Sequence, residues 1–246
     1  MAELALQLYS VREALQSDFE GTLHRIADIG YRAVETAGIY GGSPEQAARL
    51  FQSAELRVVA LHAMLPLGEQ KNAVLEMLEA LEARILVCPW ASSELFTSLE
   101  GIQRVCDLLS ETHIQLQAHG IRLAFHNHHF ECIPLADGTI PLFYMAQRLV
   151  PEIAFEIDTY WAHVGGLNVA DVLAMLGERA ALLHLKDGDG SLDEPMVALG
   201  EGIMDFPAIL LHSRAQAWIV ELDSCATDMF EAVARSFAYM QRFSGA

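Results

Sequence analysis

The sequence has few cysteines and no long apolar run. Its four cysteines lie far apart and form no CxxC pair, which gives no support to a disulfide scaffold or a zinc knuckle. No apolar stretch approaches the ~20 residues of a membrane span, and the first residues lack the pattern of a signal peptide. We therefore expect a soluble, cytoplasmic protein with reduced thiols and no membrane partner.

Basic residues are also scarce. The 33 acidic and 15 basic residues give a formal net charge of −18, which repels phosphate backbones, so we expect no nucleic-acid partner. The chain has no GxGxxG motif, no Walker lysine and no GxSxG elbow. Gly200 and Gly202 precede a predicted helix, but as a phosphate-binding signal they are weak. Nucleotide binding and serine-nucleophile chemistry are both disfavoured.

Eight repeats of a strand followed by a helix run along the chain. The predicted strands are 4–9, 33–36, 57–62, 84–88, 121–127, 153–158, 182–186 and 218–222. Helix-start signals lie at Asp18, Ser43, Ser98, Pro141, Asn168, Asp205 and Asp228. Eight alternating units predict a closed parallel (β/α)₈ barrel, and no linker divides residues 1–246 into separate domains. A doubly wound open sheet is the alternative if 33–36 and 84–88 are not strands.

Polar residues gather near the ends of the late predicted strands. Side chains alternate along a barrel strand, so the apolar neighbours that face the helices identify the inward positions. The inward polar residues predicted in this way are His126, His128, Glu156, Asp158, His184, Lys186, Glu221 and Asp223. Because the carboxyl ends of barrel strands meet at one mouth, we expect the strand-end residues to lie together.

Carboxylates buried together need compensating positive charge, which a divalent ion supplies. Mixed carboxylate and imidazole donors suit Mn²⁺, Zn²⁺, Co²⁺ or Fe²⁺ better than Mg²⁺. Plainer explanations exist: a strand histidine is often a hydrogen-bonded core residue, and Asp158 can cap a helix that begins at Thr159. Lys186 either stabilises a developing oxyanion or pairs with Asp158.

Residues on other strands and loops extend the predicted site to a ligand. Gln7 points inward on the first strand and His62 ends the third, and both can contact a hydroxylated ligand or simply line the barrel. Trp90, Phe96 and Trp161 follow strands, where flat rings can pack against the C–H face of a sugar or roof the core.

The phrases FHNHHFEC, FEIDTYWAHVGG, LLHLKDGDG, LGEGIMDF and WIVELD occur in this order. With them the chain resembles the sugar phosphate isomerase/epimerase group of the xylose-isomerase-like barrel superfamily over nearly its full length. The resemblance implies a (β/α)₈ barrel with one divalent metal, commonly Mn²⁺, held by a Glu, Asp, His, Glu set from the last four strands.

Carried over residue by residue, this set falls on Asp158, His184 and Glu221. Where many members have the first glutamate, this chain has His126, and the nearest acid is Glu131 in the following loop. Either can complete the set; we favour Glu131 as the metal ligand and His126 as a substrate contact.

A second departure from the group lies three residues after the aspartate. Trp161 stands where many epimerases have a histidine, so we assign it to substrate binding. His128 or His163 can take over the proton handling.

The resemblance predicts a divalent-metal-dependent isomerase or epimerase that moves a proton next to the carbonyl of a small sugar, keto-sugar or related polyol. Glu221 or His128 removes the proton, and Lys186 helps to hold the enediolate. Alternatives are a sugar or inosose dehydratase or lyase, a non-catalytic sugar-binding barrel, and a nuclease like the AP endonucleases, which the net charge disfavours. A homodimer is a possible assembly.

Overall fold

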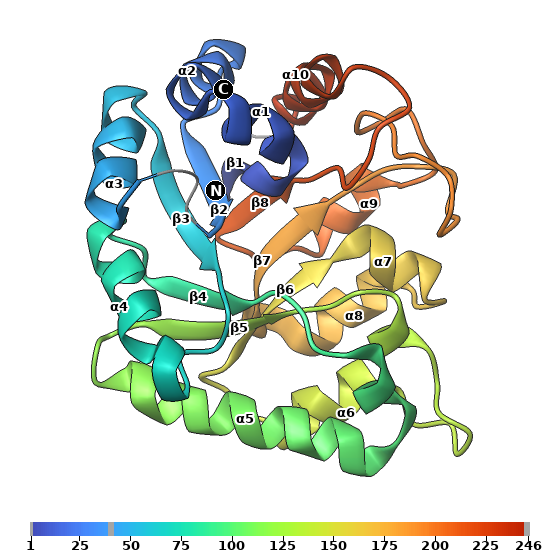
Figure 1. Ribbon diagram of the computed structural model, residues 1–246. Helices are drawn as coiled ribbons and strands as arrows, with labels where there is room; N and C mark the ends of the chain where they lie inside the picture. The colour runs from blue at the N-terminus through green and yellow to red at the C-terminus, as the bar shows by residue number, and fades with distance from the viewer. Residues whose placement is uncertain (1, 39–41, 244–246) are drawn as a thin grey trace.

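In the computed structural model, which describes residues 2–38 and 42–243, parallel strands form a closed barrel (Figure 1). The strands of the described chain are β1 (Glu3–Gln7), β2 (Ala33–Ala37), β3 (Arg57–His62), β4 (Ile85–Cys88), β5 (Arg122–His126), β6 (Ala154–Asp158), β7 (Ala180–Leu185) and β8 (Ala217–Val220). Each strand pairs with the next in the sequence, and β8 pairs with β1 to close the barrel. The predicted barrel is confirmed, and the open sheet is excluded.

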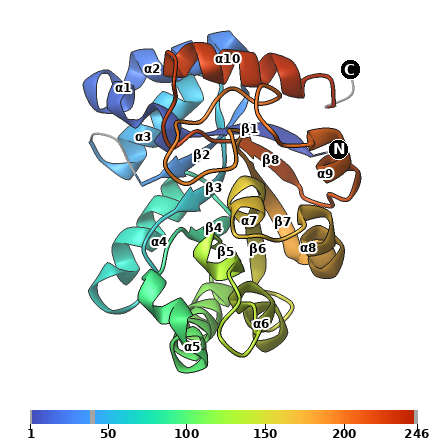
Figure 2. The ribbon, with the colours of Figure 1, turned by 90° about the vertical axis from the view of Figure 1, so that its right-hand side faces the viewer.

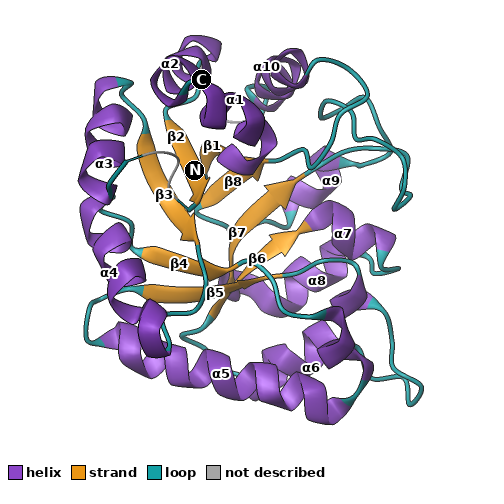
Figure 3. Cartoon of the chain, in the orientation of Figure 1, coloured by secondary structure: helices purple, strands orange, loops and turns teal. Residues whose placement is uncertain are grey.

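Helices surround the barrel on its outside, as the purple segments around the orange strands show (Figure 3). They are α1 (Arg12–Ser17), α2 (Phe19–Ile29), α3 (Pro44–Ser53), α4 (Lys71–Ala80), α5 (Leu99–Gln117), α6 (Pro141–Arg148), α7 (Thr159–Val164), α8 (Val169–Leu176), α9 (Phe206–Leu211) and α10 (Met229–Met240). Figure 2 shows β1 and β8 side by side beneath α10. No described helix is both long and apolar enough to cross a membrane.

The helices begin where side chains can satisfy their first backbone N–H groups. Asp18 caps α2 by accepting a hydrogen bond from the N–H of Gly21 at 2.9 Å, and Ser43 forms a capping box with Gln46 at the start of α3. Asp228 caps α10 in the same way. These helix starts were all predicted from the sequence.

Three predicted strands differ from the observed ones by two residues at one end, among them β8, which ends at Val220 and not at residue 222. β1 ends at Gln7 and not at residue 9, because the Gln7 side chain accepts a hydrogen bond from the N–H of Tyr9 and caps a 3₁₀ turn. β7 begins at Ala180 rather than residue 182, and a bulge opposite β6 lets Phe155 pair with Ala180 while Glu156 pairs with Leu182.

Two apolar clusters fill the space on either side of the strands. One lies between the strands and the helices and contains the outward side chains Leu123, Phe125, Phe155 and Ile157, as their parity predicted. The other fills the lower barrel, and we call it the alanine floor because alanine dominates it; it comprises Ala5, Ala33, Ala60, Ile85, Val87, Ala124, Ala154, Ala181, Leu182, Ala217 and Ile219. The inward side chains of this floor are mostly small, and the larger inward side chains lie in the layer above it.

Candidate active site

A polar layer lies directly above the alanine floor. On five strands the second residue after a floor alanine is polar, and because strand side chains repeat every two residues it points into the barrel as well. These residues are Gln7, Glu35, His62, His126 and Glu156. On β7, His184 follows Leu182 by the same step.

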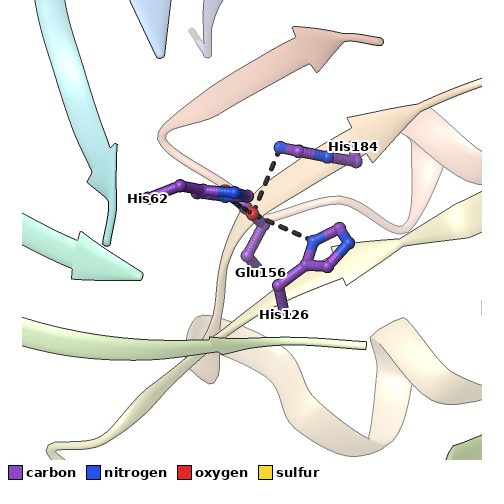
Figure 4. Close-up of side chains that lie close together, drawn as sticks. All are labelled: His62, His126, Glu156 and His184. Carbon is purple, nitrogen blue, oxygen red and sulfur yellow. Dashed lines mark hydrogen bonds and ion pairs between the residues drawn. The ribbon is translucent and has the colours of Figure 1, made fainter. Parts of the chain in front are cut away.

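Three histidines converge on one carboxylate of this layer (Figure 4). Oε2 of Glu156 lies 2.6 Å from Nε2 of His62, 3.0 Å from Nδ1 of His126 and 3.1 Å from Nε2 of His184. All four side chains are buried, and Glu156 has no exposed surface. Glu156 thus links β3, β5, β6 and β7 at the centre of the barrel.

Glu35 forms the second carboxylate of this lower layer. Its Oε2 lies 2.6 Å from Nε2 of His184 and 3.1 Å from Nε2 of His62, and it accepts a hydrogen bond of 2.7 Å from Nε2 of Gln7. Oε1 of Gln7 also accepts a hydrogen bond from the N–H of Tyr9, so both polar groups of its side chain are hydrogen-bonded within the protein. Gln7 therefore orients Glu35.

A second set of charges lies above, nearer the barrel mouth. Oε2 of Glu221 is 2.7 Å from Nδ1 of His184 and 2.8 Å from Nζ of Lys186. The same ammonium lies 3.1 Å from Oδ2 of Asp158 and 2.8 Å from Oδ2 of Asp223. Lys186 is thus held by three carboxylates although it is only 2% exposed.

Two histidines connect the two layers, with one ring nitrogen facing each. His184 turns Nε2 toward Glu35 and Glu156 and Nδ1 toward Glu221. His126 turns Nδ1 toward Glu156 at 3.0 Å, while its Nε2 lies 3.9 Å from Oδ2 of Asp158. A carboxylate that accepts one imidazole N–H fixes the tautomer and leaves the other nitrogen as a metal donor. The lower carboxylates hold both histidines in this way.

The local charges set the protonation of the histidines. Burial alone would lower the pKa of His62, but the carboxylates of Glu35 and Glu156 raise it to about 10. The pKa of His184 is likewise raised well above its ordinary value, because Glu156, Glu221 and Glu35 outweigh the effect of burial. His126 is different: burial and the neighbouring histidines lower its pKa to about 4, despite the hydrogen bond to Glu156.

The carboxylates respond to the same neighbours. Burial opposes ionisation of Glu156 and Glu221, but the positive charges beside them hold the pKa of each well below its ordinary value. Asp158 is less compensated: burial raises its pKa to about 6, while Lys186 and His184 act in the opposite direction. Glu221 and Asp158 beside Lys186 therefore carry negative charge near neutral pH.

Two overlapping groups of buried donors can hold a metal ion, each with its ligand atoms within 4.8 Å of one another. The lower group comprises His62, His126, Glu156 and His184, and the upper group comprises His126, Asp158, His184 and Glu221. Buried oxygens in the cluster lack a hydrogen bond, among them Oδ2 of Asp158. Buried carboxylate oxygens without a hydrogen-bond partner are costly, and a bound cation would compensate them.

The charge balance of the cluster also fits a divalent ion. Its five carboxylates belong to Glu35, Glu156, Asp158, Glu221 and Asp223. They face Lys186 and two histidines with raised pKa, so the cluster is short of two positive charges even with both imidazoles protonated. The upper group suits the ion better, because Nε2 of His126 lies 3.9 Å from Oδ2 of Asp158, too far for a hydrogen bond, and so keeps its lone pair for an ion.

A cavity of about 910 Å³ lies over the barrel mouth and gives a ligand access to this cluster. Six of the predicted site residues line it: His62, His126, His128, Trp161, Lys186 and Glu221. Gln7, Glu131, Asp158 and His184 are fully buried beneath it. The structure therefore places Gln7 in the support of the site rather than in its ligand-facing wall.

Glu131 lies outside both donor groups of the described residues. Its Oε2 accepts a hydrogen bond of 2.9 Å from the backbone N–H of His128, which closes the loop after β5. Burial raises the pKa of Glu131 to about 8, with Asp158 adding to the effect. Of the two alternatives for the missing glutamate, His126 is the side chain that joins Asp158, His184 and Glu221.

Asp158 caps a helix and Lys186 pairs with Asp158, and both residues also belong to the charged cluster. Oδ1 of Asp158 caps α7 by accepting a hydrogen bond of 2.8 Å from the N–H of Trp161, while its Oδ2 faces Lys186. Phe96, by contrast, is buried against Phe125 and Phe130 and belongs to the core.

The glycines at 200 and 202 have an internal partner. Their N–H groups donate to the buried carboxylate of Asp187 at 2.8 and 3.0 Å, and the N–H of Met204 donates to it at 3.1 Å. The backbone groups that might have bound a phosphate thus bind a carboxylate of the chain itself, which ties down the loop between β7 and α9.

Sequence reasoning assigned no role to Glu35, Glu156 or Asp223. Parity did turn Glu156 and Asp223 inward, but Glu35 was overlooked altogether. The signal that would have found Glu35 is the recurrence of alanine, any residue, then a polar residue in LALQ, AVE, ALH, AFH and AFE. Such a repeat marks the step from the floor of the barrel to its polar layer.

Comparisons with known proteins agree with this architecture. The model of the xylose isomerase-like TIM-barrel family matches residues 23–223. No protein of curated function matches the sequence.

Solved structures show the same fold at low sequence identity. A sugar phosphate isomerase/epimerase from Parabacteroides distasonis ATCC 8503 has a TM-score of 0.81 and 21% identity, over 98% of this chain and 93% of its own. The IOLI protein with a bound zinc atom has a TM-score of 0.72 and 16% identity, over 98% of both chains. A probable 3-DHS dehydratase, AsbF from Bacillus anthracis, has a TM-score of 0.70 and 11% identity, over 97% of this chain and 98% of its own.

The closed barrel of parallel strands and the match over most of the sequence lead to one assignment. The chain belongs to the xylose isomerase-like TIM-barrel family.

Proposed function

We propose that this protein is a divalent-metal-dependent isomerase or epimerase that transfers a proton next to the carbonyl of a sugar or keto-sugar. The observation that carries the proposal is the upper donor group at the inner end of the cavity, formed by His126, Asp158, His184 and Glu221. Two similar structures bear the names of a sugar phosphate isomerase/epimerase and an L-ribulose 3-epimerase, which supports this class of reaction.

The upper donor group would hold the ion, for which we propose Mn²⁺, with Zn²⁺, Co²⁺ and Fe²⁺ as the alternatives that its mixed donors accept. When bound, such an ion polarises a carbonyl and an adjacent hydroxyl and so acidifies the C–H between them. Glu35 and Glu156 keep His184 and His126 in the orientation and tautomer that the ion requires.

Glu221 and His128 are the residues suited to move the proton. Glu221 is ionised, because Lys186 and His184 hold its pKa well below the ordinary value despite its burial. His128 is neutral near pH 7, because burial and the neighbouring His126 and Lys186 lower its pKa to about 2. Both groups are thus unprotonated near neutral pH, as a general base must be, and each lines the cavity.

Lys186 is suited to stabilise the negative oxygen that forms when the C–H loses its proton. Its ammonium is fixed by Asp158, Glu221 and Asp223, so it would act on that oxygen through its positive charge and not through a free N–H group. It also lies 5.5 Å from the centre of the Trp161 ring, which helps to close that side of the cavity.

Deuterium exchange tests the proposed class of reaction. The Mn²⁺-loaded protein is incubated in D₂O with a panel of ketohexoses, ketopentoses and 3-keto-sugars, and exchange at the carbon next to the carbonyl is followed by NMR. Exchange with at least one compound is expected. Complete absence of exchange by protein with full metal content would contradict proton transfer.

Dehydration is a second candidate, favoured by the position of Lys186 beside Glu221. With Nζ 2.8 Å from Oε2, a base and a cation lie on the same side of the cavity, where a proton and a hydroxyl could leave from one face. The dehydratase name of one similar structure points the same way. Formation of an ultraviolet-absorbing enone, rather than an exchanged or inverted sugar, would identify this outcome.

A further inference from the structure

The cavity over the barrel mouth has two walls of different chemistry. Its volume of about 910 Å³ lies near the upper end of the ~300–1,000 Å³ range of pockets that enclose drug-sized ligands. One wall, at the ends of β7 and β8, carries Lys186, Glu221 and Asp223. The other wall is apolar, and a single sugar bound at the upper donor group would not cover it.

The apolar wall is built by the segment that runs from the end of β3 through α4 and β4 to Trp90. We call it the β3–β4 wall; its side chains are Met64, Val74, Met77, Pro89 and Trp90. Met64 is 72% exposed and Trp90 is 59% exposed, although both are large and apolar. Exposed apolar side chains that gather beside a reactive cluster are typical of a ligand-binding surface.

The two walls face each other across the mouth of the barrel. β3 and β4 lie on one side of the barrel and β7 and β8 on the other (Figure 3). A ligand whose sugar ring reaches the upper donor group therefore directs its far end toward the β3–β4 wall.

The cavity offers little to a phosphate group. In the described part of the chain, Arg12 and Lys186 are the lysine and arginine side chains that line it. Lys186 is held by three carboxylates, and Arg12 donates to the backbone carbonyls of Tyr9 at 2.8 Å and Asp223 at 3.1 Å. The carboxylates of Glu221 and Asp223 face the same space and repel a phosphate dianion.

We propose that the substrate is an uncharged sugar derivative with an apolar substituent that packs against the β3–β4 wall, and that phosphorylated sugars are not its substrates. An aromatic ring fits this wall well, because Trp90 offers a flat indole and Met64 and Met77 offer polarisable sulfurs. The inference rests on the proposed function, because it places the reacting carbon at the upper donor group.

Calorimetric titration of the Mn²⁺-loaded full chain tests the substrate class. The ligands are the phenyl and methyl glycosides of glucose, galactose and xylose as both anomers, together with glucose, galactose and their 6-phosphates. At least one phenyl glycoside is expected to bind about tenfold or more tightly than its methyl counterpart, because burial of an aromatic ring contributes that much. The 6-phosphates are expected to bind no more tightly than the parent sugars.

Variants locate the effect. Trp90→Ala and, separately, Met64→Ala should reduce the preference for the phenyl glycoside and leave the affinity for the methyl glycoside unchanged. Leu211→Ala is the matched control, because Leu211 is an exposed apolar residue outside the cavity lining. Equal affinity for every phenyl and methyl pair, or a 6-phosphate that binds tenfold more tightly than its sugar, would overturn the inference.

The deuterium-exchange experiment separates this inference from the proposed function. Exchange with simple keto-sugars but no preference for phenyl glycosides defeats the inference alone. A phenyl preference that disappears in Trp90→Ala, with no exchange in any keto-sugar, supports the apolar subsite and defeats the proposed reaction.

Discussion

The lower and upper carboxylates of the barrel face the same histidines in opposite ways. Glu35 and Glu156 have no exposed surface, and their contacts are with imidazoles and, for Glu35, the amide of Gln7. Asp158 and Glu221 contact the Lys186 ammonium at the inner end of the cavity. The comparison shows that a carboxylate's role follows from the histidine nitrogen it faces: the lower pair fixes the rings, and the upper pair is placed where it would share a metal ion with them.

Removing the histidine shared by both layers should have the largest effect. His184→Ala removes the Nδ1 donor, leaves Glu221 without its imidazole partner and leaves Glu35 with His62 alone. We expect loss of metal binding and of deuterium exchange, measured by elemental analysis and NMR. Asp158→Ala, which changes the upper layer alone, should also abolish metal binding and exchange. His119→Ala is the control, because His119 is exposed. Either site variant with full metal occupancy would refute its role as a ligand.

Lys186→Met should separate turnover from metal binding. The variant removes the ammonium that, in the proposed mechanism, stabilises the negative oxygen, and turnover should fall by about 10²–10³-fold, as for other lost electrostatic contacts in active sites. Metal affinity should be unchanged or higher, because Asp158, Glu221 and Asp223 lose a competing positive charge. Weaker Mn²⁺ binding with normal turnover per bound ion would reverse the assigned role.

Glu156→Gln tests the lower layer. Gln keeps the shape of the side chain but weakens its hold on His126 and His184, and loss of such an outer partner typically costs about 10–100-fold in metal affinity. Titration with Mn²⁺ measures the change. Glu131→Gln is the matched control, because Glu131 is a buried carboxyl outside both donor groups. If the control weakens Mn²⁺ binding as much as Glu156→Gln does, Glu131 is a ligand after all.

The smallest expected effect concerns the pH dependence of stability. The folded chain keeps the proton of Glu131 up to about pH 8, whereas the unfolded chain releases it near its ordinary pKa of 4.5. Between these values the folded state binds more protons, so this group lowers the free energy of unfolding as pH rises. Urea unfolding of Glu131→Gln between pH 5 and 8 should show a smaller decline than the original chain. Equal declines would mean that Glu131 ionises normally in the fold.

The fold was predictable because its signals are local. Strand parity and helix caps such as Asp18 and Ser43 depend on neighbouring residues, and they predicted the number and order of the strands. The ends of β1 and β7 were wrong because a side-chain cap at Gln7 and a bulge opposite Glu156 depend on contacts with other segments.

The site was only partly predictable, for a related reason. Asp158, His184 and Glu221 follow from strand ends and from the family phrases. Glu35 lies on an early strand without such a phrase, and its contact with His184 spans the barrel. The choice of His126 over Glu131 also depends on where a loop folds, which neither spacing nor residue type determines.

The central claim is tested most directly by the anomalous scattering of a Mn²⁺-soaked crystal. The account predicts one strong peak bonded to Asp158, Glu221, Nδ1 of His184 and Nε2 of His126, with Glu35 and Glu156 still bonded to the opposite ring nitrogens. A peak among Glu35, His62 and Glu156 instead would contradict the division of the barrel into a supporting layer and a metal-binding layer.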